Sequence, residues 1–281
     1  MREVNTGAVA HAVAALCEGT NYCLGEDVQA AFDRALARED SPLGRDVLRQ
    51  LQENARIARR VVYPICQDTG YAVVYAEVGQ EVHLVGKPLA EAVDAGVRHG
   101  YARGFLRKSL LRDPVARTPN TGDNTPAALH VELVPGDQVK LTVMAKGGGC
   151  ENMSGLRMLK PADGAEGIVA FVVETVRQAG SNPCPPVIVG VGIGGTFDGC
   201  AALAKRALLR PVGQPHPDPG IAALESQILE AVNALGIGPE GFGGRTTALA
   251  VHVETAPCHI ASLPVAVNLD CHAHRVLSVT L

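Results

Sequence analysis

Residues 187–195 read VIVGVGIGG, and this stretch decides the fold of the chain. Its first part, Val187 to Gly192, is a short apolar run rich in valine, which predicts a buried strand. Apolar residues recur at helical spacing on both sides of the run, over residues 168–178 and 201–209. A buried strand between two helices predicts an α/β fold in which helices and strands are mixed (α+β).

Further helices and strands are predicted on either side of this centre. Residues 7–17 are mostly apolar and predict a first amphipathic helix. Ser41 and Pro42 suit the N-cap and the first turn of another helix. One face of that helix would carry an apolar stripe made of Val47, Leu48, Leu51, Ala55 and Ala58. Residues 221–235 predict a helix that ends at Gly236.

The remaining strands include a predicted hairpin. Residues 71–78 and 248–253 are rich in small and β-branched residues and predict strands. Alternating residues at 129–133 and 139–143 flank the turn formers Pro135-Gly136-Asp137, which predicts a hairpin. The proline-rich stretch from Arg210 to Gly220 predicts a loop, too short to separate domains. We therefore expect one compact domain over residues 1–281.

Composition narrows the classes of function. A hydrophobic content of 47% with 19% charged residues is that of a globular protein. The net charge is −4 and basic residues cluster no further than the pair Arg59-Arg60, so we expect no nucleic-acid partner. No apolar stretch approaches the roughly 18 residues of a membrane span. His11 and Glu3 make the N-terminus unlike an export signal, and we expect a cytoplasmic protein.

Cysteine is the most informative residue type. The chain has eight cysteines: Cys17, Cys23, Cys66, Cys150, Cys184, Cys200, Cys258 and Cys271. Without an export signal, this number favours metal ligation or buried thiols over disulfides. No CxxC pair occurs, which argues against a zinc ribbon or a thioredoxin-like site. If a metal is bound, its ligands come from distant parts of the chain.

Three polar segments are poorly suited to packing alone. Residues 64–70, PICQDTG, place a thiol beside an amide and a carboxylate in a loop, which is either a site edge or a buried cysteine with a turn. Residues 120–126, NTGDNTP, are a run of turn formers, which form either part of a site or only a turn. Residues 146–152, KGGGCEN, follow a strand and precede a predicted helix. Their glycine amides and Lys146 suit the binding of an anion, the alternative being a flexible connector.

Two further segments carry cysteine. Cys184 lies between prolines, in a rigid chain that suits a metal ligand. The following Gly190–Gly195 matches the dinucleotide fingerprint, but the acidic residue expected about twenty positions later is replaced by the proline-rich loop. Because the glycines match this fingerprint in part, a dinucleotide-dependent oxidoreductase is the alternative among enzymes. Near the C-terminus, cysteine and histidine recur within a short span at Cys258, His259, Cys271 and His272.

Taken in order, these segments resemble the class I fumarase and L-tartrate dehydratase family in its two-subunit form. The resemblance rests on PICQDTG, NTGDNTPA, KGGG with ENMS, NPCPP, VGIGGTFD, the segment from residue 235 to 268, and DCHAHR. It covers the chain from about Ser41 to Arg275. Several distinctive segments in the same order are far more specific than any one motif.

The resemblance implies a [4Fe–4S] cluster held by three cysteines with one iron left open. The family's ligands correspond to Cys66, Cys184 and Cys271 in this sequence. An open iron acts as a Lewis acid toward a substrate hydroxyl. Cys150 stands where serine is commoner in the family, and we assign it to the glycine segment and not to the ligands.

The resemblance also implies the residues that act on substrate. Gln67 and Asp68 would touch the substrate or its leaving hydroxyl, and Arg107 would bind a carboxylate in a bidentate manner. The amides of Gly147, Gly148 and Gly149 would hold a further carboxylate oxygen. His259 would donate a proton to the departing hydroxide, a role that Asp68 could share.

The expected reaction needs a partner. The family's Lys-Ser-Thr segment, which supplies the catalytic base, does not occur in this sequence. We therefore expect a separate β subunit to carry it, in an assembly of two α and two β subunits. The expected activity is that of a hydro-lyase acting on fumarate/malate, L-tartrate/oxaloacetate or a related dicarboxylate. The non-enzymatic alternative is a regulatory subunit of the same fold, which predicts losses among the three ligand cysteines.

Overall fold

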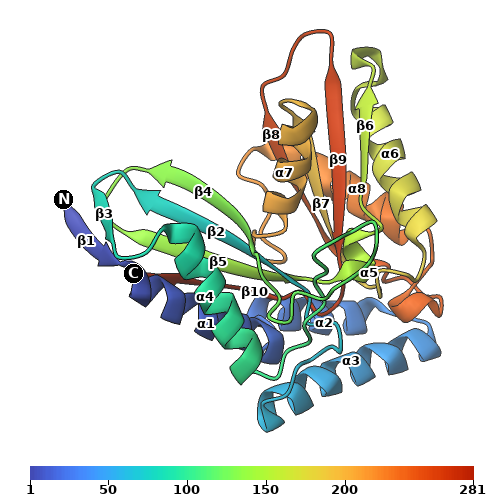
Figure 1. Cartoon of the computed structure of the whole chain (residues 1–281). Helices are drawn as coiled ribbons and strands as arrows, with labels where there is room; N and C mark the ends of the chain where they lie inside the picture. Colours follow the sequence, from blue (N-terminus) through green and yellow to red (C-terminus); the bar gives the residue numbers. More distant parts are fainter. The chain divides into compact units, whose positions relative to one another are not determined.

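The strands of this chain form three separate sheets, and the helices cover two of them (Figure 1). The computed structural model describes residues 1–281. Contacts divide the chain into two compact units, and each unit is built from several segments. The first unit contains residues 1–25, 55–148 and 275–281, and the second contains residues 26–54 and 149–274. The mixed α/β class is confirmed, whereas the single domain stays a prediction.

The first unit is a four-stranded sheet covered by two helices (Figure 1). Its elements are β1 (Arg2–Asn5), α1 (Thr6–Tyr22), β2 (Tyr71–Gly79), β3 (Val82–Val85), α4 (Leu89–Arg103), β4 (Ala128–Val134), β5 (Val139–Lys146) and β10 (Val276–Thr280). The sheet has the order β10-β5-β2-β4, and β1 pairs with β3 in a small parallel sheet. Apolar side chains of α1 and α4 pack on the inner face of the large sheet, where Val13, Val97 and Val74 are fully buried.

The two helices of the first unit approach each other closely because α4 carries glycine at the contact. A Cβ on Gly96 would lie 2.6 Å from the carbonyl oxygen of Ala10, and one on Gly100 would lie 2.7 Å from that of Ala14. A larger residue at either position would force α1 and α4 apart. The predicted helix over residues 7–17 is confirmed as the centre of α1.

The predicted hairpin is wrong in its pairing. Both strands exist, as β4 and β5, but β2 lies between them, parallel to β4 and antiparallel to β5. Gly79 at the end of β2 enters the turn, where a Cβ would lie 2.4 Å from the carbonyl oxygen of Gly136. Its N–H donates to the carbonyl of Gln138 at 2.8 Å. Alternating polarity predicts a strand with one buried face, but it does not identify the neighbouring strand.

The second unit is a four-stranded sheet with helices on both faces (Figure 1). Its elements are α2 (Glu26–Arg38), β6 (Gly155–Leu159), a 3₁₀ turn η1 (Pro161–Asp163), α6 (Gly164–Ala179), β7 (Val187–Gly194), α7 (Phe197–Ala207), α8 (Pro219–Asn233), a second 3₁₀ turn η2 (Pro239–Gly241), β8 (Ala248–Ala256) and β9 (Leu263–Asp270). Two helices, α3 (Pro42–Val61) and the single turn α5 (Gly148–Glu151), pass from one unit to the other along the chain. The sheet has the order β6-β9-β7-β8.

Close packing explains the glycines of residues 187–195. Val187, Val189 and Val191 of β7 face the core shared with α6 and α8. The alternate residues face α7, and a Cβ would lie 2.2 Å from the carbonyl oxygen of Ala204 at Gly190 and 2.1 Å from that of Cys200 at Gly192. These glycines lie inside the strand, whereas a dinucleotide site needs them in the turn after it. The helices at 168–178 and 201–209 are confirmed as α6 and α7.

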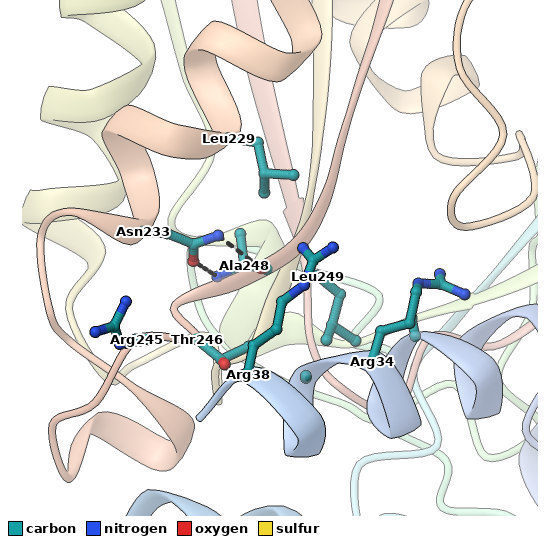
Figure 2. A pocket seen from close by; sticks show the side chains of 10 residues that line it. Arg34, Arg38, Leu229, Asn233, Arg245, Thr246, Ala248 and Leu249 are labelled. Carbon is teal, nitrogen blue, oxygen red and sulfur yellow. Dashed lines mark hydrogen bonds between the residues drawn. The ribbon is translucent and has the colours of Figure 1, made fainter. Parts of the chain in front are cut away.

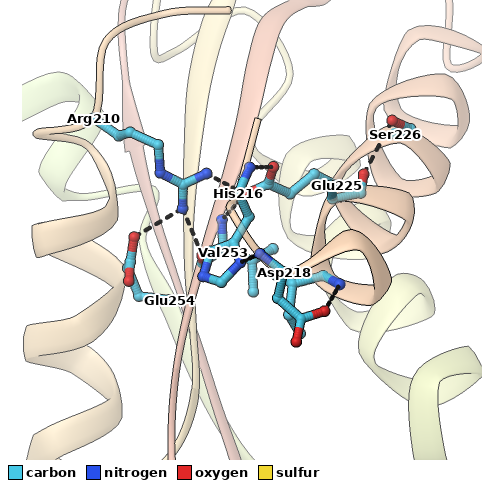
Figure 3. Close-up of polar contacts among 9 residues, drawn as sticks. Arg210, His216, Asp218, Glu225, Ser226, Val253 and Glu254 are labelled. Carbon is cyan, nitrogen blue, oxygen red and sulfur yellow. Dashed lines mark hydrogen bonds and ion pairs between the residues drawn. The ribbon is translucent and has the colours of Figure 1, made fainter. Parts of the chain in front are cut away.

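A buried ion network fixes the proline-rich loop of the second unit (Figure 3). The guanidinium of Arg210 donates to Glu225 at 2.6 Å and to Glu254 at 2.8 Å. The second oxygen of the Glu225 carboxylate accepts the N–H of His216 at 3.0 Å. Glu225 is only 6% exposed, so α8, β8 and the loop share one satisfied buried charge.

Four further predicted elements are confirmed. The helices at 41–58 and 221–235 are α3 and α8, and the strands at 71–78 and 248–253 are β2 and β8. The Ser41 hydroxyl caps α3 by accepting the N–H of Gly44 at 3.1 Å. None of the helices combines the length and apolar character needed to cross a membrane.

Candidate active site

The loop at residues 64–70 carries the first predicted ligand, Cys66, and it is held in place by hydrogen bonds within the first unit. Ile65 N–H donates to the carbonyl of Asn21 at 2.8 Å at one end. At the other end the buried Tyr101 hydroxyl donates to the carbonyls of Thr69 and Gly70 at 3.0 and 2.9 Å. The Cys66 thiol is half-buried and lies 3.3 Å from the side-chain oxygen of Gln67, which is itself exposed.

Asp68 joins this loop to the glycine segment. Its carboxylate accepts the N–H of Gly70 at 3.1 Å through Oδ1 and that of Gly148 at 2.8 Å through Oδ2. One of the predicted anion-binding amides, that of Gly148, therefore already holds a carboxylate of the protein. The helix predicted after the glycines is only the single turn α5, and β6 follows it.

Arg107 lies beside the same loop. The Thr69 hydroxyl donates to the main-chain carbonyl of Arg107 at 3.2 Å. The Arg107 side chain is exposed, and its guanidinium forms no ion pair. The first unit thus brings together Cys66, Gln67, Asp68, Arg107, Gly147 and Gly148. Lys146, predicted to add charge here, is instead 2% exposed within β5.

Two residues that support this loop were not predicted. The buried Arg275 guanidinium donates from Nη1 to the carbonyl of Asp68 at 2.6 Å and to the Asn21 side chain at 3.1 Å. The fully buried Asn124 donates to the carbonyl of Gly70 at 3.2 Å and accepts the N–H of Ser109 at 2.8 Å. Segment 120–126 is therefore more than a surface turn. Both residues lie in motifs quoted above, Arg275 in DCHAHR and Asn124 in NTGDNTP, and their polar side chains in these motifs could have identified them.

The neighbouring Asp123 shows why segment 120–126 is rigid. Its carboxylate accepts hydrogen bonds from the hydroxyl and the N–H of Thr125 at 2.7 and 3.0 Å, and it pairs with Arg98 at 2.8 Å. Partial burial raises the pKa of Asp123, but these donors outweigh it and lower the pKa to about 2.

A second group of cysteines converges in the second unit. The ligand atoms of Cys150, Asp270 and Cys271 lie within 4.8 Å of one another, and all three residues are buried. The Cys150 thiol also lies 3.4 Å from the carbonyl of Pro183. The N–H of His272 donates to the carbonyl of Cys184 at 3.3 Å, so the segments of the predicted ligands Cys184 and Cys271 are adjacent. Cys150 was excluded from the ligands, although the structure places it beside one of them.

The geometry of Cys184 differs from that of a packed thiol. Its φ is +55°, a backbone conformation that a residue other than glycine rarely adopts, and its side chain is exposed. Such conformations persist where surrounding structure fixes them, often at functional sites. The N–H of Cys184 donates to the carbonyl of Ser181 at 3.0 Å.

Two cysteines outside this set, Cys17 and Cys200, have thiols with a raised pKa. Burial raises the pKa of the Cys17 thiol to about 12, with the Glu18 charge adding to the shift. Burial also raises the pKa of the Cys200 thiol. Thiols that stay protonated are poor metal ligands, because the thiolate is the form that binds. Cys66 in the first unit and Cys184 and Cys271 in the second unit each offer a thiol, the type of donor that iron–sulfur clusters use.

Two histidine–carboxylate contacts lie on either side of Cys271 in the sequence. His274 Nδ1 lies 2.6 Å from Asp270 Oδ2, and both side chains are buried. His272 Nε2 lies 3.4 Å from Glu240, and burial raises the pKa of that carboxyl. The His274–Asp270 hydrogen bond ties the segment after β9 to the end of that strand.

His259 does not lie with Cys271 and the cysteines next to it. It is exposed in the loop between β8 and β9, at the start of β9, whereas Cys271 follows the end of that strand. The strand from Leu263 to Asp270 spans roughly 23 Å at about 3.3 Å per residue. Nδ1 of His259 accepts the N–H of Ala261 at 3.1 Å, which leaves Nε2 as the protonated nitrogen of the neutral ring.

Comparison with known proteins identifies the class to which this fold and site belong. The chain belongs to the fumarate hydratase (Fumerase) family, whose sequence model matches residues 10–280. The chain is 42% identical over 258 residues to a Methanocaldococcus jannaschii protein named "Putative L(+)-tartrate dehydratase subunit alpha", covering 90% of both chains. It is 34% identical over 252 residues to the Escherichia coli (strain K12) "L(+)-tartrate dehydratase subunit alpha", covering 89% of this chain and 83% of that protein. The expected family is confirmed. Both relatives are named as subunits, which implies that each has a partner.

Proposed function

We propose that this chain is the cluster-bearing subunit of a hydro-lyase that removes water from, or adds it to, a four-carbon dicarboxylate. The observation that carries the proposal is the hydrogen bond from Thr69 to the carbonyl of Arg107, 3.2 Å long. It holds an arginine without an acidic partner beside the loop of Cys66, so a carboxylate clamp and a metal ligand share one scaffold. L-Tartrate/oxaloacetate and fumarate/malate are the substrate pairs that the names of the relatives and the family suggest.

The proposed cofactor is a [4Fe–4S] cluster with Cys66, Cys184 and Cys271 as ligands. When bound, its open iron supplies a Lewis acid that polarises the C–O bond of the substrate. None of the eight cysteines forms a disulfide, which suits a reducing compartment, and we propose that the enzyme acts in the cytoplasm.

The side chains of this subunit would bind the substrate and place a proton. The Arg107 guanidinium would take one carboxylate through two parallel N–H donors. Gln67 and the amides of Gly147 and Gly149 would orient the other polar groups. Dehydration breaks a C–O and a C–H bond, and the departing hydroxide must be protonated. Asp68 and His259 are the proposed proton donors, with His259 donating from Nε2.

His259 would act on a neighbouring copy of the chain. Within its own unit it lies at the opposite end of β9 from Cys271, and its loop is exposed. An assembly with two copies of this chain would allow each copy to present His259 to the other. The base that removes the C–H proton would come from the Lys-Ser-Thr segment of a β subunit.

The test is reconstitution with and without the partner. We expect the chain with reconstituted iron and sulfide to be silent toward L-tartrate and fumarate on its own and active once the β subunit is added. General base catalysis is worth about 10²–10⁴-fold, so the difference should be at least of that size. Turnover by the 281-residue chain alone at the rate of the complex would contradict this division of labour. Identical rates with iron-free protein would contradict the cluster.

A further inference from the structure

A pocket of about 340 Å³ opens in the second unit, between the C-terminal half of α2, the end of α8 and the start of β8 (Figure 2). Its polar lining includes Arg34, Arg38 and Arg245, and its apolar lining includes Ala31, Ala35 and Leu249. The volume falls within the range of about 300–1,000 Å³ that small-molecule sites occupy. None of the residues proposed above for the hydro-lyase reaction lines this pocket.

The pocket concentrates positive charge. Arg34 and Arg38 are one helical turn apart on α2, where like charges repel each other, and neither forms an ion pair. Arg245 pairs with Asp40 at 2.6 Å, but both side chains are exposed, so that pair is weak. No acidic side chain lines the pocket. In this view Arg245 lies on one side of Ala248, and Arg34 and Arg38 lie on the other (Figure 2).

The wall that carries Arg245 is fixed by buried side chains. The Glu39 carboxylate, 2% exposed, accepts the N–H of Arg245 at 2.9 Å and that of Thr246 at 3.1 Å. The side-chain oxygen of Asn233 accepts the N–H groups of Thr247 and Ala248 at 2.8 and 2.9 Å. The protein's own hydrogen bonds therefore hold this wall of the pocket, which lowers the entropic cost of binding on that side.

We propose that this pocket binds a small organic polyanion with carboxylate or phosphate groups. Guanidinium groups present paired N–H donors that match both oxyanions, and two such groups here have no acidic partner. The methyl groups of Ala31 and Ala35 and the side chain of Leu249 would contact the carbon skeleton. The proposal does not depend on the proposed hydro-lyase function, because it uses none of the same residues.

Isothermal titration of the full chain tests the proposal, with citrate, 3-phosphoglycerate and inorganic phosphate as probes at constant ionic strength. Constant ionic strength separates binding from general screening of surface charge. We expect citrate or 3-phosphoglycerate to bind, and the more tightly bound of the two distinguishes a carboxylate site from a phosphate site. The double variant Arg34→Ala/Arg38→Ala should weaken binding by about tenfold or more per guanidinium. The single variant Arg38→Gln should also weaken binding. It keeps the test decisive if the double variant does not fold.

Two controls assign the binding to this pocket. Arg49→Ala removes an exposed arginine of α3 that does not line the pocket, and it should leave binding unchanged. Arg107→Ala removes the proposed substrate clamp and should also leave binding unchanged. The proposal is overturned if no probe binds, if only inorganic phosphate binds, or if the Arg34 and Arg38 variants bind as tightly as the natural chain. Loss of binding in Arg107→Ala alone would also overturn it, by assigning the anion to the substrate site.

Discussion

The carboxylate of Asp68 accepts a hydrogen bond from the main-chain N–H of Gly148 at 2.8 Å, and this contact joins the loop of Cys66 to the glycine segment. The two segments are far apart in the sequence, yet they meet through one side chain of the first unit. Asp68 therefore has a positioning role in addition to its proposed part in proton transfer.

Replacement of Asp68 tests both roles. Asp68→Asn keeps the shape of the side chain but removes its charge, and we expect kcat to fall by about 100-fold or more. Bound iron should be retained, since Asp68 is not a proposed ligand. Steady-state rates and iron content of the reconstituted complex are the measurements. Asp113→Asn is the matched control, because that carboxylate also accepts two main-chain N–H groups but lies in another loop.

Arg107 should determine substrate affinity. Arg107→Lys keeps the positive charge but loses the paired donors, so we expect kcat/KM to fall by about 10-fold or more. Lys108→Ala changes an exposed neighbour and should leave kinetics unchanged. Equal effects of the two substitutions would show that the loop, and not the guanidinium, matters.

The buried ion network should dominate the stability of the second unit. Glu225→Gln leaves the largely buried Arg210 with Glu254 as its remaining carboxylate partner, and we expect a loss of about 2 kcal/mol in the free energy of unfolding. Urea denaturation measures the change. Glu230→Gln replaces an exposed glutamate of the same helix and should cost less than about 0.5 kcal/mol.

Stability should also depend on pH through His252. Burial, with a contribution from the Arg210 charge, lowers the pKa of His252 from 6.5 to about 4. Below pH 6.5 the unfolded chain takes up a proton that the folded chain takes up only near pH 4, so stability falls across that window. The loss attributable to this residue is on the order of 3 kcal/mol.

Urea unfolding as a function of pH measures the effect of His252. His252→Gln should flatten the dependence between pH 6.5 and 4, whereas His11→Gln, an exposed histidine, should not. An unchanged slope in His252→Gln would contradict the assignment.

Local patterns predicted about half of the helices and strands, whereas α2, β1, β3, β6, β9 and β10 and the pairing of the strands were not predicted. The apolar runs at Val187 and Tyr71 predicted β7 and β2, because burial on both faces leaves a continuous apolar signature. Helix α4 was missed because glycines at its contact with α1 weaken the helical pattern. The hairpin was wrong because the insertion of β2 depends on the close approach of Gly79 and Gly136, a long-range contact.

The candidate site was likewise predicted in part from sequence, and the rest required the fold. The family resemblance implied Cys66, Asp68 and Arg107 as site residues, and the first unit brings them together. The support of the loop by Tyr101 and Asn124 required the fold, since neither residue is near it in sequence. The distance of His259 from Cys271 follows from the length of β9 and not from any motif.

The central claim is that this chain holds an iron–sulfur cluster through Cys66, Cys184 and Cys271. Iron and sulfide analysis of the anaerobically reconstituted Cys271→Ser chain tests it most directly, beside Cys258→Ser as an exposed control and Cys150→Ser as the nearest other thiol. We predict about four iron and four sulfide per chain in the natural protein and in both other variants, and loss of most of the iron in Cys271→Ser. Full iron content in Cys271→Ser, or its loss in Cys150→Ser instead, would contradict the account.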